Sequence, residues 1–202
     1  MVLVDKPGAS QSELRVGHLG VARRSPDFEA LQVMNMALGG QFVSRINMNL
    51  REDKGFTYGA RTVVDARRGR GPFVVQAAVQ AASTAAAITE IVGELEAICG
   101  GRPVVADELS TAQASIIRGF ARNFETPEQI ARATAQLTLH DLPDDHFDHY
   151  LRRIGDVTSD DVTRVARQYL RVERLTIVTV GPAATVADGL RSLGFGEPTT
   201  TP

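Results

Sequence analysis

Cysteine and aromatic residues are scarce in this sequence of 202 residues. Cys99 is the one cysteine, which excludes an internal disulfide framework and a zinc site built from several cysteines. There is no tryptophan, and only three Tyr and eight Phe are present, so the core must be built mainly from Ala, Val, Leu and Ile. No apolar run approaches the roughly 20 residues of a membrane-spanning helix, so no membrane span is predicted.

An excess of charge of either sign is also missing. The 22 Lys and Arg residues are balanced by 24 Asp and Glu, which leaves a net charge of −2. A net charge this small produces only a weak electrostatic field, which argues against a nucleic-acid partner. Hydrophobic residues make up 43% of the chain, and with this length they predict one globular domain over residues 1–202.

The order of predicted elements favours an α+β fold over a strictly alternating α/β fold. Period-2 and helical spacing of apolar residues, with turn residues between them, define the elements. Residues 25–27 (Ser-Pro-Asp) predict a helix start with Ser25 as N-cap and Pro26 at the first helical position. We expect a two-layer domain with one mixed, mostly antiparallel sheet and helices packed on one face. Strands are predicted at residues 2–4, 12–22, 56–66, 72–80 and 175–180, and helices at 26–38, 43–54, 83–99, 106–124, from 126 onward, 143–154, 159–170 and 185–193.

Several motifs of known chemistry are absent. The sequence holds no His-x-x-Glu-His in either direction, no Gly-x-Ser-x-Gly elbow and no phosphate-binding Gly-x-x-x-x-Gly-Lys loop. His146 and His149 are three residues apart on a predicted helix and could share a face. A zinc site would need a further ligand, and the surrounding acids fit a solvated helix start better. No metal ligand and no cofactor are therefore assigned to this chain.

The densest group of chemically useful residues lies in residues 39–60. Arg51 falls in the last turn of a predicted helix, Gly55 reverses the chain, and Tyr58 begins a strand. An Arg and a Tyr on one surface could stabilise a carbonyl oxygen as it gains negative charge. The alternative from the residues alone is that Arg51 caps the helix and the Tyr58 ring packs on the sheet.

These residues resemble the signature of the non-zinc-binding half of pitrilysin/insulinase-type zinc peptidases, a family that includes mitochondrial processing peptidase. The matching motifs lie in the family's order over nearly the whole chain, with Ile46 in place of the usual Leu. They are Ser25-Pro26-Asp27, Leu38-Gly39-Gly40, Ser44-Arg45-Ile46, Leu50-Arg51-Glu52, Gly55, Tyr58-Gly59, Asp107-Glu108-Leu109 and the stretch from residue 157 to residue 182.

The resemblance implies a role for two of these residues. In this family two homologous halves face each other, and the half with the inverted zinc motif carries the metal that polarises the scissile carbonyl and activates water. Arg51 and Tyr58 match the positions from which the other half reaches the substrate, so they are predicted to orient the peptide and stabilise the oxyanion. The alternative from a different class is a scaffolding or peptide-binding domain of the same fold.

Further expectations follow from the same resemblance. The chain is expected to be the C-terminal half of a longer two-domain peptidase, to hold no zinc itself and to cleave no peptide alone. Its expected partners are a zinc-bearing homologous half and an extended peptide, with a dimer as a further possibility. The resemblance favours the periplasm over the cytoplasm, and the tail at residues 198–202 is expected to be frayed.

Overall fold

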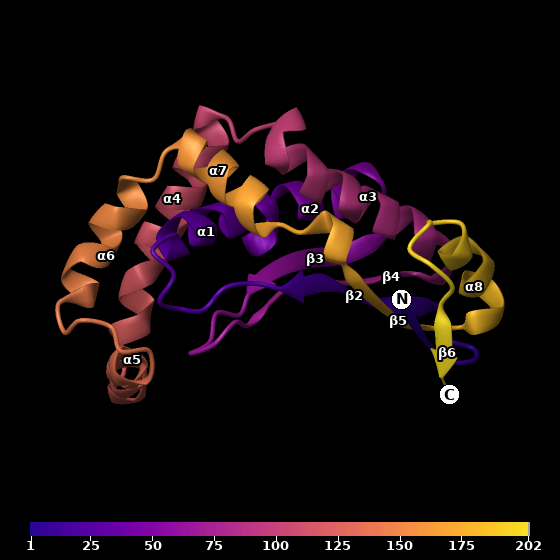
Figure 1. The fold of residues 1–202 in the computed structure, drawn as a ribbon, viewed down its shortest axis with the longest axis horizontal. Coiled ribbons are helices and arrows are strands. Elements are labelled where there is room, and N and C mark those ends of the chain that lie inside the picture. Colours follow the sequence, from indigo (N-terminus) through magenta and orange to yellow (C-terminus); the bar gives the residue numbers. More distant parts are fainter. Residues whose placement is uncertain (202) are drawn as a thin grey trace.

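A mixed six-stranded sheet forms one layer of the protein (Figure 1). The structure is a computed structural model that describes residues 1–201. The strand order is β3-β4-β2-β5-β1-β6; β3, β4, β2 and β5 pair antiparallel, whereas β1 is parallel to both β5 and β6. The strands are β1 (Val2–Asp5), β2 (Gln11–Leu19), β3 (Thr57–Val64), β4 (Pro72–Gln80), β5 (Thr176–Gly181) and β6 (Thr199–Thr201).

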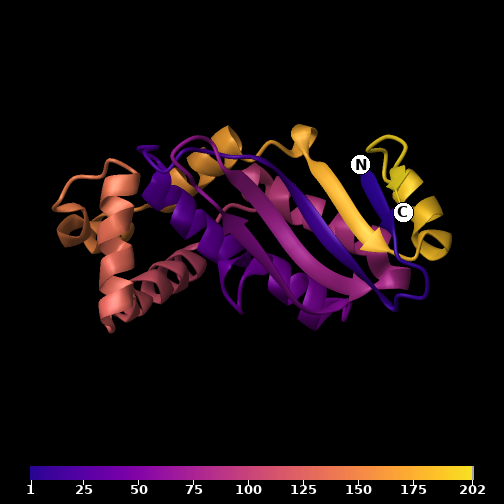
Figure 2. The same ribbon diagram turned by 90° about the horizontal axis from the view of Figure 1, so that it is seen from below.

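Helices cover one face of this sheet, and the view from below in Figure 2 shows the strands in front of them. Helices α4, α5 and α6 extend past one end of the sheet (Figure 1). The predicted α+β class, with a mixed and mostly antiparallel sheet, is confirmed. The helices are α1 (Phe28–Asn35), α2 (Arg45–Asn47), α3 (Thr84–Glu96), α4 (Ala106–Phe120), α5 (Pro127–Leu139), α6 (His146–Gly155), α7 (Ser159–Tyr169) and α8 (Ala183–Arg191).

The core lies between the two layers and is mainly aliphatic, as the scarcity of aromatic residues requires. In β2, Leu14 and Val16 are fully buried, while the alternate residues Glu13 and Arg15 face solvent. This alternation is the period-2 pattern of a strand with one face on the core. No helix within residues 1–201 has both the length and the apolar character needed to cross a bilayer.

The start of α1 differs from the prediction. The helix begins at Phe28 rather than at Pro26, and Ser25 Oγ accepts only a 3.3 Å hydrogen bond from the Asp27 N–H. The Asp27 carboxylate accepts hydrogen bonds from Arg164 (2.8 Å) and from the Tyr169 hydroxyl (2.7 Å), both on α7. The local sequence pattern predicted Ser25 as the N-cap. In the structure, Asp27 instead joins the start of α1 to α7, which is distant in the sequence.

The C-terminal tail also differs from the expectation. Residues Thr199–Thr201 form β6 and pair in parallel with β1, where a frayed end was expected from residue 198. The Thr199 N–H donates a 3.1 Å hydrogen bond to the Met1 carbonyl. Three β-branched residues beside an open sheet edge favour this added strand.

Gly39 brings the end of the first helical segment against β3. After α1 the helix continues as a π-helix over Met36–Gly40. A Cβ atom at Gly39 would lie 2.5 Å from Thr62 Cγ2 and 2.8 Å from the Thr62 backbone nitrogen. The Leu-Gly-Gly motif therefore permits a close approach of helix to strand that no side chain would allow.

We expect Gly39→Ala to lower the free energy of unfolding by about 1–3 kcal/mol, because β3 or the helix must shift to admit the methyl group. Gly93→Ala is the matched control, since a Cβ at Gly93 on α3 meets no atom within 4 Å. There the same change should stabilise the protein by up to about 1 kcal/mol. Urea unfolding of both variants measures the difference; equal effects would show that Gly39 is not a packing contact.

Candidate active site

The first part of the candidate site is a helix that ends where the chain reverses. The π-helical segment Met48–Asp53 continues α2 and carries Arg51 near its end. Gly55 has a φ of +64°, a left-handed conformation that favours glycine, and the Phe56 N–H donates to the Leu50 carbonyl at 2.8 Å. The reversal predicted at Gly55 is confirmed, and it leads directly into β3.

The second part is a β-bulge at the start of β3. Thr57 is opposite Val79 and Ala60 is opposite Ala77, so β3 has one residue more than β4 between these pairs. The Thr57 hydroxyl fixes the irregular backbone, because it donates to the Ala78 carbonyl (2.6 Å) and accepts from the Gly59 N–H (3.1 Å).

Asn47 supports the same bulge from the helix side. Its Oδ1 accepts a 2.9 Å hydrogen bond from the Ala60 N–H, and its Nδ2 donates to the Phe42 carbonyl at 2.6 Å. The side chain is buried, so both bonds are shielded from water. Asn47 therefore joins β3 to the turn before α2.

The bulge turns the Tyr58 side chain into solvent. Its exposed fraction is 92%, which is unusual for an aromatic residue, and two consecutive residues, Tyr58 and Gly59, are exposed where a regular strand would alternate. No hydrogen bond of its hydroxyl occurs among the contacts within residues 1–201. The alternative in which the ring packs on the sheet is therefore wrong.

Arg51 is held in place loosely. Its guanidinium carbon lies 4.3 Å from the centroid of the Phe42 ring, a cation–π contact, and its Nε is 3.5 Å from Glu52 Oε1. One third of the side chain is exposed. An ion pair this long and this exposed contributes little stability, so the guanidinium keeps donors for another group.

Arg51 and Tyr58 line the same groove. Its volume is about 550 Å³, and Gln11, Thr57 and Gln80 are among the other residues in its wall. The structure thus brings together the two residues that the sequence singled out. A fixed positive charge, a phenolic hydroxyl and carboxamides on one concave surface can bind a peptide carbonyl through hydrogen bonds. That use of the two residues stays a prediction.

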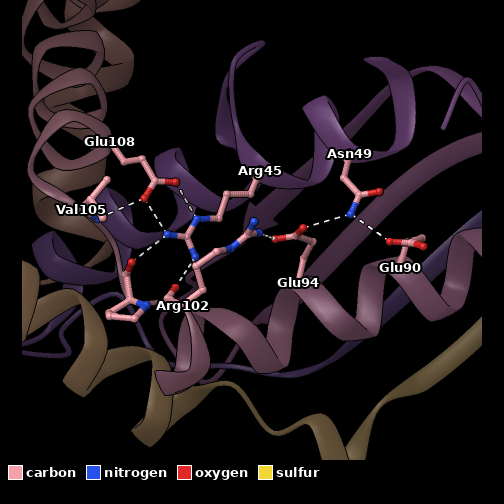
Figure 3. Close-up of polar contacts among 8 residues, drawn as sticks. Arg45, Asn49, Glu90, Glu94, Arg102, Val105 and Glu108 are labelled. Atoms are coloured by element: carbon pink, nitrogen blue, oxygen red, sulfur yellow. Dashed lines mark hydrogen bonds and ion pairs between the residues drawn. The ribbon is translucent and has the colours of Figure 1, made fainter. Parts of the chain in front are cut away.

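A buried arginine fixes the helix that leads to Arg51 (Figure 3). Arg45 donates to both carboxylate oxygens of Glu108 on α4, at 2.7 Å from Nε and 2.6 Å from Nη2. It also donates to the carbonyls of Arg102 (2.5 Å) and Pro103 (3.0 Å). The Glu108 carboxylate further accepts from the Val105 N–H at the start of α4 (3.1 Å). All of these partners stand more than 50 residues away from Arg45 in the sequence.

A second set of contacts ties the same helix to α3. Asn49 Nδ2 donates to Glu90 and Glu94, at 3.0 Å each. Glu94 also pairs with Arg102, and Glu90 pairs with Lys54 Nζ at 2.9 Å. Figure 3 shows Asn49 and Glu94 as the link between the helix with Arg45 and α3. The motifs around Arg45 and Glu108 did not predict either set of contacts, because Arg45 and Asn49 are more than 40 residues away from their partners in the sequence.

The histidine pair considered as a metal site is used otherwise. Both ring nitrogens of His146 lie 3.0 Å from guanidinium nitrogens, those of Arg23 and Arg153, and His149 pairs with Asp145 at 3.3 Å. Two fixed positive charges against one imidazole disfavour a bound cation. Across residues 1–201 no group of three or more His, Cys, Asp or Glu side chains could hold a metal ion.

Comparison with known families agrees with this architecture. A family model described as the peptidase M16 inactive domain matches residues 1–116, more than half of the chain. The chain belongs to the peptidase M16 inactive-domain family. The resemblance inferred from the motifs is confirmed.

Relatives of this M16 domain are named as zinc proteases. The chain is 26% identical over 179 residues to an uncharacterised zinc protease of Mycobacterium leprae, covering 89% of this chain and 40% of that protein. The chain therefore spans less than half the length of this relative.

Two solved structures show the same fold. The peptidase M16 inactive domain from Pseudomonas fluorescens superposes with a TM-score of 0.80 at 23% identity, over 90% of this chain and 44% of that one. A chain of complex III from Candida albicans superposes with a TM-score of 0.79 at 12% identity, over 95% of this chain and 48% of that one. At these identities the likeness establishes the fold of the M16 domain alone.

The Glu108 carboxylate makes the stability of this M16 domain depend on pH. Hydrogen bonds from Arg45 hold the pKa of Glu108 below its usual value of 4.5, against the opposing effect of burial. Because the folded pKa is lowered, the stabilisation is present above about pH 4.5 and is lost as the pH falls through the folded value.

We expect Glu108→Gln to lower the free energy of unfolding at pH 7 by about 1–3 kcal/mol, because it removes the negative charge that compensates the buried Arg45 and leaves one acceptor oxygen in place of two. The difference from the parent protein should narrow as the pH falls below 4.5 and through the lowered pKa of Glu108 in the folded protein, where this side chain becomes neutral. Glu128→Gln is the control; its pair with Arg132 is exposed and should change stability by less than about 0.5 kcal/mol. Urea titrations at several pH values test this, and a constant difference at all pH values would contradict it.

Proposed function

We propose that this M16 domain is the non-zinc half of a two-part zinc metallopeptidase, in which Arg51 and Tyr58 bind the carbonyl of the peptide being cleaved. The observation that carries the proposal is the 92% exposure of Tyr58 at the rim of the groove that Arg51 also lines. An aromatic ring held in water by a β-bulge contributes nothing to the core, so its position calls for a function outside folding.

The two side chains offer complementary donors. The Tyr58 hydroxyl can donate one hydrogen bond, and the Arg51 guanidinium supplies several donors and a fixed positive charge. Such donors stabilise the negative charge that grows on a carbonyl oxygen during hydrolysis. In bulk water they would be weakened by hydration, so a second protein wall that excludes water would make them effective.

Extended peptides could be held beside the pair by backbone pairing. β3 is the outermost strand at its end of the sheet, and it begins at the Tyr58 bulge. An edge strand offers free N–H and C=O groups to a peptide that lies alongside it. The metal chemistry is assigned to the zinc-bearing partner half, because no cluster of metal-ligating side chains is found in the part of the chain that the structure describes.

A scaffolding domain is the second candidate. The likeness to a chain of complex III supports it, since that chain has the same fold within a large assembly. A scaffold has no need of an exposed Tyr beside a loosely held Arg in one groove. The placement of Arg51 and Tyr58 therefore favours the peptidase proposal.

We expect Tyr58→Phe to lower kcat on a peptide about 10-fold or more when the chain is combined with a zinc-bearing half, because one oxyanion donor is removed. Stability should be unchanged, since the hydroxyl is exposed. Arg51→Ala should lower kcat at least as far. Peptide turnover with the zinc half, and thermal unfolding of the chain alone, provide the two measurements.

Arg174→Ala is the matched control for Arg51→Ala, because Arg174 is an exposed arginine outside the groove that makes a single weak ion pair within residues 1–201, with Glu173 at 3.8 Å. It should leave turnover unchanged. Full activity in both Tyr58→Phe and Arg51→Ala, with the complex intact, would favour the scaffold.

A further inference from the structure

A second cavity lies at the far end of the molecule from β6, among α4, α5 and α6 (Figure 1). Its volume is about 410 Å³, within the range of small-ligand pockets. The groove with Arg51 and Tyr58 shares none of its lining residues. Its principal walls are Arg23, Phe28, Phe120, Phe124, Phe147 and Tyr150.

Aromatic rings are concentrated in this pocket. Five of the eleven Phe and Tyr residues of the chain line it. Phe120 stacks with Tyr150 at 5.4 Å between ring centroids, and Phe124 meets Phe147 edge-on at 5.3 Å. In a protein with so few aromatic residues, this concentration of rings around one cavity provides an apolar surface for a ligand.

Helix α5 forms one side of the pocket but buries none of its own side chains. None of its residues from Pro127 to Leu139 is buried, and Ile130 and Leu139 are about half exposed. Few apolar contacts thus hold this wall in place, so the pocket can admit a ligand at small cost.

Arg23 enters the pocket without an acidic partner. Its guanidinium carbon lies 3.7 Å from the centroid of the Phe28 ring, and no carboxylate lies within ion-pair distance of it in the part of the chain that the structure describes. Burial lowers the pKa of Arg23, yet an arginine stays protonated in proteins. Glu29 attracts the Arg23 guanidinium from beyond ion-pair distance, but it is already paired with Arg153 at 3.0 Å. Two partly buried positive charges thus share one carboxylate, and a bound anion would supply the second negative charge.

The neighbouring His146 does not satisfy this arginine. Burial, followed by Arg23 and Arg153, lowers the pKa of His146, so its imidazole is neutral at pH 7. A neutral imidazole accepts one hydrogen bond, but both nitrogens face guanidinium donors at 3.0 Å. Arg153 has Glu29 as a further acceptor at 3.0 Å, whereas Arg23 has none. Of the two guanidinium groups around His146, that of Arg23 is therefore the one left without a good acceptor.

We propose that this pocket binds an organic carboxylate with an aromatic or branched aliphatic body. The carboxylate would accept hydrogen bonds from Arg23, and the apolar body would lie against the Phe and Tyr rings. Two sources share this chemistry: a free carboxylic acid, and the C-terminal carboxylate of a peptide that ends in an apolar residue.

Titration of the full chain, followed by amide chemical shifts, tests the proposal with three probes. 3-Phenylpropionate represents the free acid, N-acetylphenylalanine the peptide terminus, and N-acetylphenylalanine amide lacks the charge. We expect at least one carboxylate to bind with a Kd on the order of 1 mM, as its small size allows, and to shift residues around Phe124 and Tyr150. The carboxylate that binds more tightly identifies the source, and the amide should not saturate.

Three variants complete the test. Arg23→Gln should weaken carboxylate binding about 10-fold or more, whereas Arg118→Gln, an exposed arginine on α4 outside the pocket, should not. Ala133→Phe fills the cavity from α5 and should abolish binding even if Arg23→Gln fails to fold. The proposal is overturned if neither carboxylate saturates, if the amide binds equally well, or if Ala133→Phe leaves binding intact.

Discussion

The guanidinium of Arg45 is the contact on which the candidate active site depends. It is almost fully buried, so its charge is tolerable only because Glu108 and two backbone carbonyls take up its donors. Those acceptors lie before and within α4, and Arg45 itself begins the helix that carries Arg51 near its end. One side chain thereby fixes the helix bearing the candidate catalytic arginine against the helical layer. Loss of Arg45 or Glu108 would leave a charge or a carbonyl without a hydrogen-bond partner in the interior, so movement of this helix away from α4 is unfavourable.

The strand side of the site is organised in the opposite way, by a local irregularity rather than by a long-range ion pair. The extra residue in β3 costs ladder hydrogen bonds, and the side chains of Thr57 and Asn47 replace them. The gain is a Tyr58 ring that stands free of the sheet beside Arg51. These hydrogen bonds fix the backbone position from which the Tyr58 side chain extends, so the backbone need not be ordered for a contact made by that side chain. The aromatic pocket near α5 is independent of this arrangement.

Much of the fold could be predicted from the sequence, because the patterns that specify it are local. Gly55 indicates the reversal, and alternation along β4 indicates a strand with one buried face. The family motifs predicted Arg51 and Tyr58 as site residues. The pairing of Arg45 with Glu108 was missed because 63 residues separate them and no local pattern encodes a long-range contact. The bulge was missed because residues 56–66 read as one regular strand.

The proposed function requires the Tyr58 ring to lie against the peptide when a zinc-bearing half is present. A photo-reactive phenylalanine placed at position 58 tests it directly, with a labelled peptide and the cognate half. The same group at the exposed Val105, which lines neither the groove nor the aromatic pocket, is the reference. Cross-linking to the peptide from position 58, dependent on the zinc-bearing half and absent from position 105, is the predicted result. Cross-linking that is absent at position 58, or equal at both positions, would contradict the proposed role of this domain in substrate binding.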